Sequence, residues 1–276
     1  MDLQVSGLFV YPVKGCRGIA HDRVPIDRSG LLHDRRWLVV DQQASFLTQR
    51  THPRLALIEP RIERDALVLS SEGRGAVSVP LSAGLERRRV RIWKDEVEAI
   101  AVDADASRWI GDLLDAEVSL VRMPPDVVRA VKPAYGQPGD RLAFADAFPL
   151  LVATEASLSD LDGRLDRPLP MDRFRPNIVV RGGVPWMEDA WRRVRVGDVP
   201  LRLVKGCDRC VVTTTDQRTG EREVEPLRTL ATVRKRDGKV YFGMNAVPEA
   251  RGILTVGEPV TVLDVSAAGG AMAFPT

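Results

Sequence analysis

Cysteine, histidine and aromatic residues are scarce in this sequence. Three cysteines and three histidines occur among the 276 residues, and aromatic residues make up 5%. So few cysteines cannot form the disulfide framework on which small secreted proteins depend, and the sequence therefore excludes that class. We expect a reducing compartment and predict that the protein is cytoplasmic.

Long apolar runs and an excess of one charge are missing too. No stretch approaches the roughly 20 apolar residues of a membrane helix, and the first five residues show no secretory signal. Forty Lys and Arg residues nearly balance 38 Asp and Glu residues, so no overall field attracts nucleic acid or a membrane surface. We expect a soluble protein that binds neither nucleic acid nor membrane.

Short runs of β-branched and aromatic residues, separated by glycine and proline, fill most of the sequence. They recur at roughly ten-residue spacing, which is typical of β-barrels and β-sandwiches. Helical spacing of apolar residues occurs at 107–114, after Thr154, and after Pro226. We predict a mainly β, α+β fold with a few helices and two β-barrel-like domains.

A polar segment rich in proline and glycine, residues 123–139, interrupts these runs. Such a composition is typical of a linker or a surface loop. We predict an N-terminal domain over residues 1–122 and a second domain over residues 123–268. The small residues of 269–276 predict a flexible tail.

Residues 205–210, Lys-Gly-Cys-Asp-Arg-Cys, contain two of the three cysteines. Strand-like runs at 199–204 and 211–215 flank them, so we predict a tight turn between two strands. Lys205 and Arg209 lie beside the thiols, and nearby cations favour the thiolate form that attacks or binds metal.

Three kinds of site are compatible with the spacing of Cys207 and Cys210. Half of a zinc site would need a second ligand pair, and Cys16 and the histidines lie far upstream at no finger-like spacing. A redox pair should open a helix, whereas residues 211–215 look like a strand. The third possibility is one thiolate, Cys210, that ligates a metal held mainly by a large cofactor. We favour this third interpretation.

Several cations lie at the ends of predicted strands, where binding sites tend to form. Lys14 follows a strand in a glycine-containing turn, Arg35 stands beside Asp34, and Arg175 precedes Pro176. A solvated surface side chain is the default interpretation of each. They gain meaning if the fold brings them together around an anion.

Five motifs in this order resemble the MOSC family, over most of the chain. They are residues 11–16 (YPVKGC), 34–39 (DRRWLV), 154–158 (TEASL), 174–177 (FRPN) and 207–210 (CDRC). The resemblance implies an N-terminal β-barrel domain followed by a MOSC domain, and it is greatest to the mitochondrial amidoxime-reducing component and its bacterial relatives.

The resemblance also implies a molybdenum cofactor, in which a pterin dithiolene and one protein cysteine hold the metal. By motif that cysteine is Cys210, which we expect to be both metal ligand and catalytic residue. The positions that match cofactor contacts are Lys14, Arg35, Thr154, Ser157, Arg175, Asn177, Asp208 and Arg209.

The implied activity is reduction of N-hydroxylated compounds, in which the N–O bond breaks and oxygen passes to molybdenum. The sequence shows no plant-type cysteine run for a [2Fe–2S] domain. We therefore expect electrons from a separate donor protein, ferredoxin-like or cytochrome b5-like with a reductase. The alternative is a molybdenum cofactor carrier or a sulfur carrier without reductase turnover.

Overall fold

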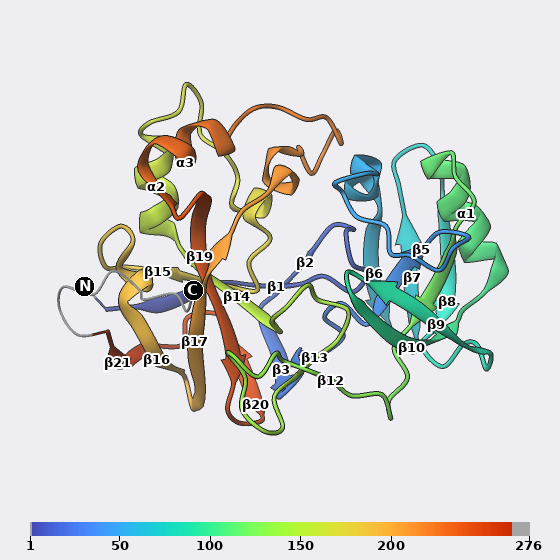
Figure 1. Cartoon of the computed structure of the whole chain (residues 1–276), viewed down its shortest axis with the longest axis horizontal. Helices are drawn as coiled ribbons and strands as arrows, with labels where there is room; N and C mark the ends of the chain where they lie inside the picture. The colour runs from blue at the N-terminus through green and yellow to red at the C-terminus, as the bar shows by residue number, and fades with distance from the viewer. Residues whose placement is uncertain (1, 267–276) are drawn as a thin grey trace.

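Strands are the main regular elements of the fold, and Figure 1 shows them gathered in two lobes. The structure is a computed structural model that describes residues 2–266. One lobe consists mainly of blue to green segments from the first half of the chain, and the other mainly of yellow to red segments from the second half. The prediction of a mainly β fold with a few helices is confirmed. The predicted flexible tail, 269–276, lies outside the described residues.

Within residues 2–266, nine strands form the largest sheet. In chain order they are β1 (Gln4–Val10), β2 (Ile19–His21), β14 (Leu150–Thr154), β15 (Ile178–Arg181), β16 (Trp191–Val196), β17 (Val199–Asp208), β18 (Lys235–Arg236), β19 (Lys239–Pro248) and β21 (Val260–Val265). In space they follow the order β2-β1-β15-β14-β19-β17-β16-β21, with β18 paired to β19. Strands β14 and β15 are parallel. Apolar side chains that include Val5, Ile178 and Met244 form the core against this sheet.

The start of the chain is built into this second-half sheet. Strand β1 pairs with β15 in antiparallel register, with Gln4 opposite Arg181. Strand β3 (Arg23–Asp27) pairs with β20 (Gly252–Thr255) and with β4 (Gly30–Leu31). The turns that follow β1 and β4 are therefore anchored where the two halves of the chain meet. The predicted division after residue 122 stays a prediction.

The other lobe has two smaller sheets with a core of their own. One sheet has, in spatial order, β5 (Trp37–Val40), β11 (Ser119–Arg122), β10 (Asp95–Ala101) and β9 (Arg87–Ile92), and the other has β6 (Glu59–Glu63), β7 (Ala66–Ser70) and β8 (Ala76–Pro80). Buried side chains from both sheets and from helix α1 (Ala104–Leu114), which include Trp37, Leu67 and Ile110, form one core. A further short pair consists of β12 (Arg129–Ala130) and β13 (Arg141–Leu142).

Two further α-helices, α2 (Glu155–Asp162) and α3 (Leu227–Val233), lie on the second lobe. Thr154 caps α2 as predicted, since its side chain accepts a hydrogen bond from the Ser157 amide. Short 3-10 turns are η1 (Pro53–Leu57), η2 (Met171–Phe174), η3 (Met187–Ala190) and η4 (Val211–Thr214). None of the helices in residues 2–266 has the length and apolar character of a membrane span.

The prediction of a turn at 205–210 followed by a strand at 211–215 is wrong. Strand β17 continues to Asp208, because the long partner β19 pairs with it as far as Asp208 opposite Tyr241. Residues 211–214 form the turn η4 instead. The Thr213 hydroxyl donates to the Cys210 carbonyl at 3.0 Å, a local bond that competes with strand pairing.

Candidate active site

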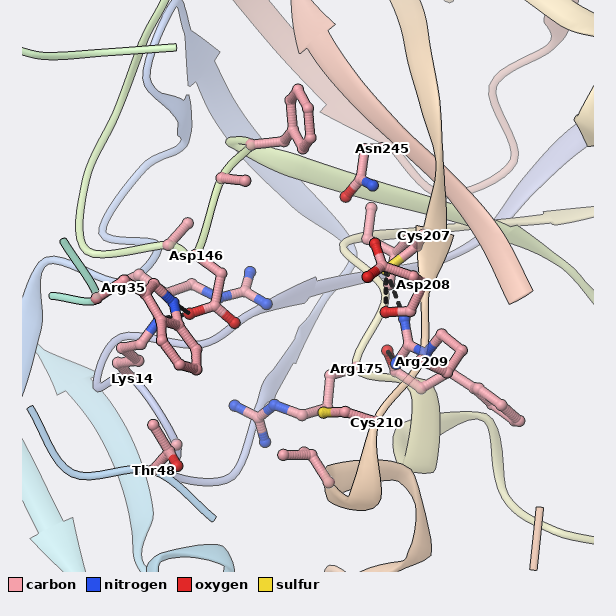
Figure 2. A pocket seen from close by; sticks show the side chains of 18 of the residues that line it. Lys14, Arg35, Thr48, Asp146, Arg175, Cys207, Asp208, Arg209, Cys210 and Asn245 are labelled. Carbon is pink, nitrogen blue, oxygen red and sulfur yellow. Dashed lines mark hydrogen bonds and ion pairs between the residues drawn. The ribbon is translucent and has the colours of Figure 1, made fainter. Parts of the chain in front are cut away.

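A cavity of about 670 Å³ lies between segments from both halves of the chain. Figure 2 shows Lys14, Arg35 and Asp146 on one side of it, and Cys207, Asp208 and Asn245 on the other. The fold therefore brings together residues as far apart in the sequence as Lys14 and Asn245. Seven predicted site residues line the cavity, namely Lys14, Arg35, Arg175, Asn177, Asp208, Arg209 and Cys210.

The two cysteines of the wall have different surroundings. Cys207 lies near the end of β17, and its Sγ accepts a hydrogen bond of 2.9 Å from Arg209 Nη1. Burial raises the pKa of Cys207, and the charge of Arg209 only partly offsets this. The prediction that neighbouring cations favour a thiolate is therefore wrong for Cys207. Cys210 stands at the start of η4, half-buried, and no side-chain or backbone group of residues 2–266 hydrogen-bonds its sulfur.

Asp208 stands between two ammonium groups at the end of β17. Lys205 Nζ and Lys239 Nζ each lie 3.5 Å from one of its carboxylate oxygens. Burial raises the pKa of Asp208, but the two lysines outweigh burial and the pKa lies below its ordinary value. This carboxyl is therefore ionised at neutral pH and has no proton to give.

Arg35 and Arg175 share the ring of Tyr11. Each guanidinium carbon lies 4.3 Å from the ring centroid, and the Tyr11 hydroxyl donates to the Pro176 carbonyl at 3.0 Å. Both arginines have left-handed backbones, with φ of 48° for Arg35 and 55° for Arg175. Such strain is uncommon outside glycine and concentrates at functional sites. Burial lowers the pKa of Arg175.

The side-chain amide of Asn177 holds Arg35 in place, and its oxygen and nitrogen each make two hydrogen bonds. Its Oδ1 accepts from Arg35 Nη1 at 3.0 Å and from the Leu151 amide at 3.1 Å. Its Nδ2 donates to Asp34 Oδ1 and to the Phe9 carbonyl, both at 3.1 Å. The other oxygen of Asp34 accepts from Arg35 Nη1 at 2.6 Å. Asn177 therefore lines the cavity chiefly as a support for the guanidinium.

Lys14 is buried and already paired. Its Nζ donates to the Phe144 carbonyl at 2.9 Å and to Asp146 Oδ1 at 2.6 Å. The same oxygen accepts from Trp93 Nε1 at 2.9 Å. Burial lowers the pKa of Lys14, and the charge of Asp146 opposes this. Sequence reasoning missed Asp146 and Trp93, because nothing local marks a contact across 132 residues.

A pair of buried glutamines joins the halves beneath Arg175. Gln49 Nε2 donates to Gln217 Oε1 at 2.9 Å, and Gln217 Nε2 donates to Gln49 Oε1 at 3.0 Å. Gln217 Oε1 also accepts from Arg175 Nη1 at 3.1 Å, and Gln49 Nε2 donates to the Gly15 carbonyl at 2.7 Å. No sequence pattern indicates this pair, since isolated glutamines are ordinarily surface residues.

Thr154 and Ser157, predicted as cofactor contacts, do not line the cavity. Both are fully buried, and both hydroxyls donate to Glu188 Oε2, at 3.0 Å and 2.8 Å. Their hydroxyls are occupied in fixing the start of α2 against a buried carboxylate. The structure thus separates these two residues from the other seven.

The chemistry of the lining fits a large anionic cofactor with a metal. In residues 2–266 no three His, Cys, Asp or Glu side chains lie close enough to hold a metal ion, which disfavours the zinc interpretation. A metal at the Cys210 sulfur must therefore bring most of its ligands with it. Among the described lining residues, eight cations face three carboxylates, and this excess suits a phosphate-bearing group.

Comparison with known proteins identifies the two halves of this fold. Residues 2–117 match the MOSC N-terminal beta barrel domain, and residues 139–261 match the MOSC domain. Mitochondrial amidoxime-reducing component 1 from Mus musculus and that from Homo sapiens are each 35% identical to this chain, over 94% of it and 82% of the relative. The chain belongs to the MOSC family. Lys14 and Arg35 fall in the first matched segment of this MOSC protein, and Arg175 and Cys210 fall in the second.

A more distant relative is the molybdenum cofactor sulfurase of Danio rerio. It is 30% identical over 87% of this MOSC protein, which corresponds to 31% of that longer relative.

The prediction of a cytoplasmic location is contradicted by these comparisons. The amidoxime-reducing relatives of this MOSC protein are named as mitochondrial proteins. The prediction rested largely on low cysteine content. Scarce cysteine argues against a disulfide framework but does not distinguish one reducing compartment from another.

Proposed function

We propose that this MOSC protein is a molybdenum-cofactor-dependent reductase of N-hydroxylated compounds. The observation that carries the proposal is the cavity in which the Cys210 sulfur, free of hydrogen bonds from residues 2–266, faces cations from both halves. The relatives named as amidoxime-reducing components support the same reaction class. Cys210 is the metal ligand in this proposal, since a soft thiolate suits molybdenum.

The cations around the cavity hold the pterin and its phosphate. Arg35 and Arg175 present planar guanidinium groups, which pair with phosphate oxygens two at a time. Lys14 adds a compact charge, and Arg209 lies on the cysteine side. Asn177 positions Arg35, and Asp208 anchors the two lysines beside Cys207. Because these groups are held by protein contacts, little reorganisation accompanies binding.

When bound, the molybdenum cofactor supplies the two-electron reduction of the N–O bond. An amidoxime takes up two electrons and two protons, the N–O bond breaks, and an amidine and water leave. The protein residues orient the cofactor and restrict solvent around it. A separate donor protein, ferredoxin-like or cytochrome b5-like with a reductase, delivers the electrons.

The test measures metal and turnover on the same preparation. The full chain is produced with cofactor supplied, its molybdenum content is determined by mass spectrometry of metals, and benzamidoxime reduction is followed with reduced methyl viologen as donor. We expect molybdenum near one equivalent and formation of benzamidine. Zinc in place of molybdenum would overturn the metal assignment.

A cofactor carrier or a sulfur carrier is the second candidate function. The observation in its favour is the second thiol in the wall, Cys207, which Arg209 contacts at 2.9 Å. Molybdenum content without turnover favours the cofactor carrier. Mass spectrometry of the intact protein that shows an added sulfur atom on Cys207 favours the sulfur carrier.

A further inference from the structure

The carboxylates that line the cavity are all neutralised by lysine or arginine. Among the described lining residues these are Asp95, Asp146 and Asp208. Asp95 pairs with Arg129 at 2.7 Å, and Asp146 pairs with Lys14 at 2.6 Å. Asp208 has two lysine neighbours at 3.5 Å. No lining carboxylate is therefore left to attract a cationic ligand.

Three lining cations, by contrast, have side chains with neither an ion pair nor a hydrogen bond to any group within residues 2–266. They are Arg50, Lys94 and Lys132. Lys94 lies in the turn between β9 and β10, Lys132 follows β12, and both side chains are exposed. The Arg50 guanidinium lies 4.6 Å from the ring centroid of Trp93. The cavity therefore has unpaired positive charge at its exposed rim.

The inner cations differ from this rim because protein groups hold each of them. Lys14 has Asp146, Arg35 has Asp34, and Arg175 donates to Gln217. These inner groups match the positions that we assign to the cofactor. A cofactor phosphate bound to the inner groups leaves the charge of the rim unsatisfied.

Trp93 gives the rim a rigid aromatic surface. Its indole Nε1 donates to Asp146 Oδ1 at 2.9 Å, and its ring meets Phe46 edge-on with centroids 4.9 Å apart. It remains 48% exposed, on a left-handed backbone with φ of 57°. An exposed indole beside cations suits a planar ligand with a negative group.

We propose that this rim selects N-hydroxylated substrates that carry an anionic group, such as a carboxylate or a phosphate. Arg50, Lys94 and Lys132 attract and orient the anionic end while the N–OH group points toward Cys210. The proposal rests on the proposed reductase function and adds a substrate class to it. A cleft lined by one sign of charge raises the local concentration of the oppositely charged ligand.

The test uses two aryl amidoximes that differ in charge, 4-carboxybenzamidoxime and 4-(aminomethyl)benzamidoxime. Reduced methyl viologen serves as donor, so no docking of a donor protein affects the rates. We expect kcat/KM to be roughly tenfold higher for the carboxylate at low salt. The ratio should fall several-fold as ionic strength rises toward about 0.5 M, because salt screens exposed charges.

Variants assign the effect to the rim. The triple variant Arg50→Gln, Lys94→Gln, Lys132→Gln should bring the ratio of the two kcat/KM values close to one. Lys235→Gln removes an exposed lysine that does not line the cavity, and it should keep the wild-type ratio. Equilibrium dialysis without an electron donor measures the same preference as a ratio of Kd values, independently of turnover.

Equal kcat/KM and equal Kd for the two compounds would overturn the proposal while leaving the reductase function intact. Absence of turnover with both compounds would reject the reductase function, and the Kd ratio would still decide the charge preference. If the triple variant weakens only the use of an acidic donor protein and keeps the substrate ratio, the rim is a donor-docking surface and the proposal fails.

Discussion

The two walls of the cavity are prepared for ligands in opposite ways. The cation wall, which we define as Lys14, Arg35 and Arg175, is held by carboxylates, an amide and the ring of Tyr11 before any ligand arrives. The sulfur wall, Cys207 and Cys210, keeps the Cys210 sulfur without a hydrogen bond from residues 2–266. The difference teaches that electrostatic binding gains from groups fixed in advance, whereas metal coordination needs a ligand atom left open.

The largest effect is expected from breaking the sulfur wall with Cys210→Ser. A serine hydroxyl is a harder and more basic ligand than a thiolate, so molybdenum should be lost together with benzamidoxime reduction. We expect metal affinity to fall by about 100-fold or more. Molybdenum analysis and turnover on the same sample measure this. Full metal content in a folded Cys210→Ser variant would contradict the assignment of the ligand.

Tyr11 connects the cation wall across the two halves, and two substitutions separate its functions. Tyr11→Leu removes a ring that is 2% exposed and supports two guanidinium groups, so it should lower the free energy of unfolding by about 3 kcal/mol. It should also lower cofactor retention. Tyr11→Phe keeps the ring and loses the hydroxyl bond to Pro176, at about 1 kcal/mol.

Urea unfolding and cofactor content decide between these contributions. Tyr11→Phe should retain near-normal cofactor, because the aromatic face under Arg35 and Arg175 remains. If Tyr11→Phe loses as much cofactor as Tyr11→Leu, the hydroxyl bond rather than the ring positions the arginines.

The glutamine pair tests whether the cation wall depends on contacts between the halves. Gln217→Leu leaves the buried Gln49 Oε1 without its donor, although Gln49 Nε2 keeps its bond to the Gly15 carbonyl, and it should lower the free energy of unfolding by about 1–3 kcal/mol. Adding Gln49→Leu removes the stranded partner, so the double variant should be less destabilised than the sum of the singles. A double-variant cycle of urea unfolding measures this coupling. Strict additivity would show that the two amides act independently.

The sequence predicted most of this architecture but few of its long-range polar contacts. The strand runs and the Thr154 cap follow from local periodicity and capping chemistry, and the structure contains both. The motif resemblance supplied Lys14, Arg35 and Cys210, which the cavity brings together. Composition and spacing alone do not predict that these residues lie around one cavity, because the fold determines which distant residues come together.

The failures have specific physical causes. Residues 211–215 are β-branched, yet 211–214 form a 3-10 turn, because the pairing of β17 with β19 extends the preceding strand to Asp208. The thiolate prediction for Cys207 considered the nearby charge and omitted burial, which raises its pKa. Thr154 and Ser157 bond Glu188, a buried residue on another segment, and do not line the cavity, so their assignment as cofactor contacts stays a prediction. Each error concerns tertiary context that no local pattern contains.

The ion pair of Lys14 and Asp146 supports the cation wall, and its contribution to the free energy of unfolding depends on pH. Burial alone raises the pKa of Asp146, but Lys14, the hydrogen bond from Trp93 and the charge of Arg50 together outweigh burial and hold the pKa below its ordinary value. A carboxyl with a lowered folded pKa stabilises the fold above its unfolded pKa, and this contribution is lost as the pH falls through the folded value. Asp146 is 52% exposed, so screening limits its contribution to about 1 kcal/mol at pH 7.

Asp146→Asn should therefore be less stable than the wild type at pH 7, and the difference should shrink as the pH falls below about 4. Urea unfolding at several pH values measures it. Arg87 and Asp126 form an exposed pair in the other lobe, and Asp126→Asn is the matched control with a smaller effect at pH 7. A difference for Asp146→Asn that grows toward low pH would mean that Lys14 does not stabilise the carboxylate.

We expect the smallest effect from Cys207→Ser, although Cys207 lies in the same sulfur wall as Cys210, whose substitution should have the largest effect. Its sulfur accepts a hydrogen bond from Arg209, and burial favours the neutral thiol, so a serine hydroxyl can accept the same bond. Molybdenum content and turnover should stay within about twofold of the wild type, because a preserved hydrogen bond changes free energy by a few tenths of a kcal/mol. If Cys207→Ser alone abolished metal binding while Cys210→Ser did not, the open ligand of the sulfur wall would be Cys207, and the order of the two cysteines in this comparison would be reversed.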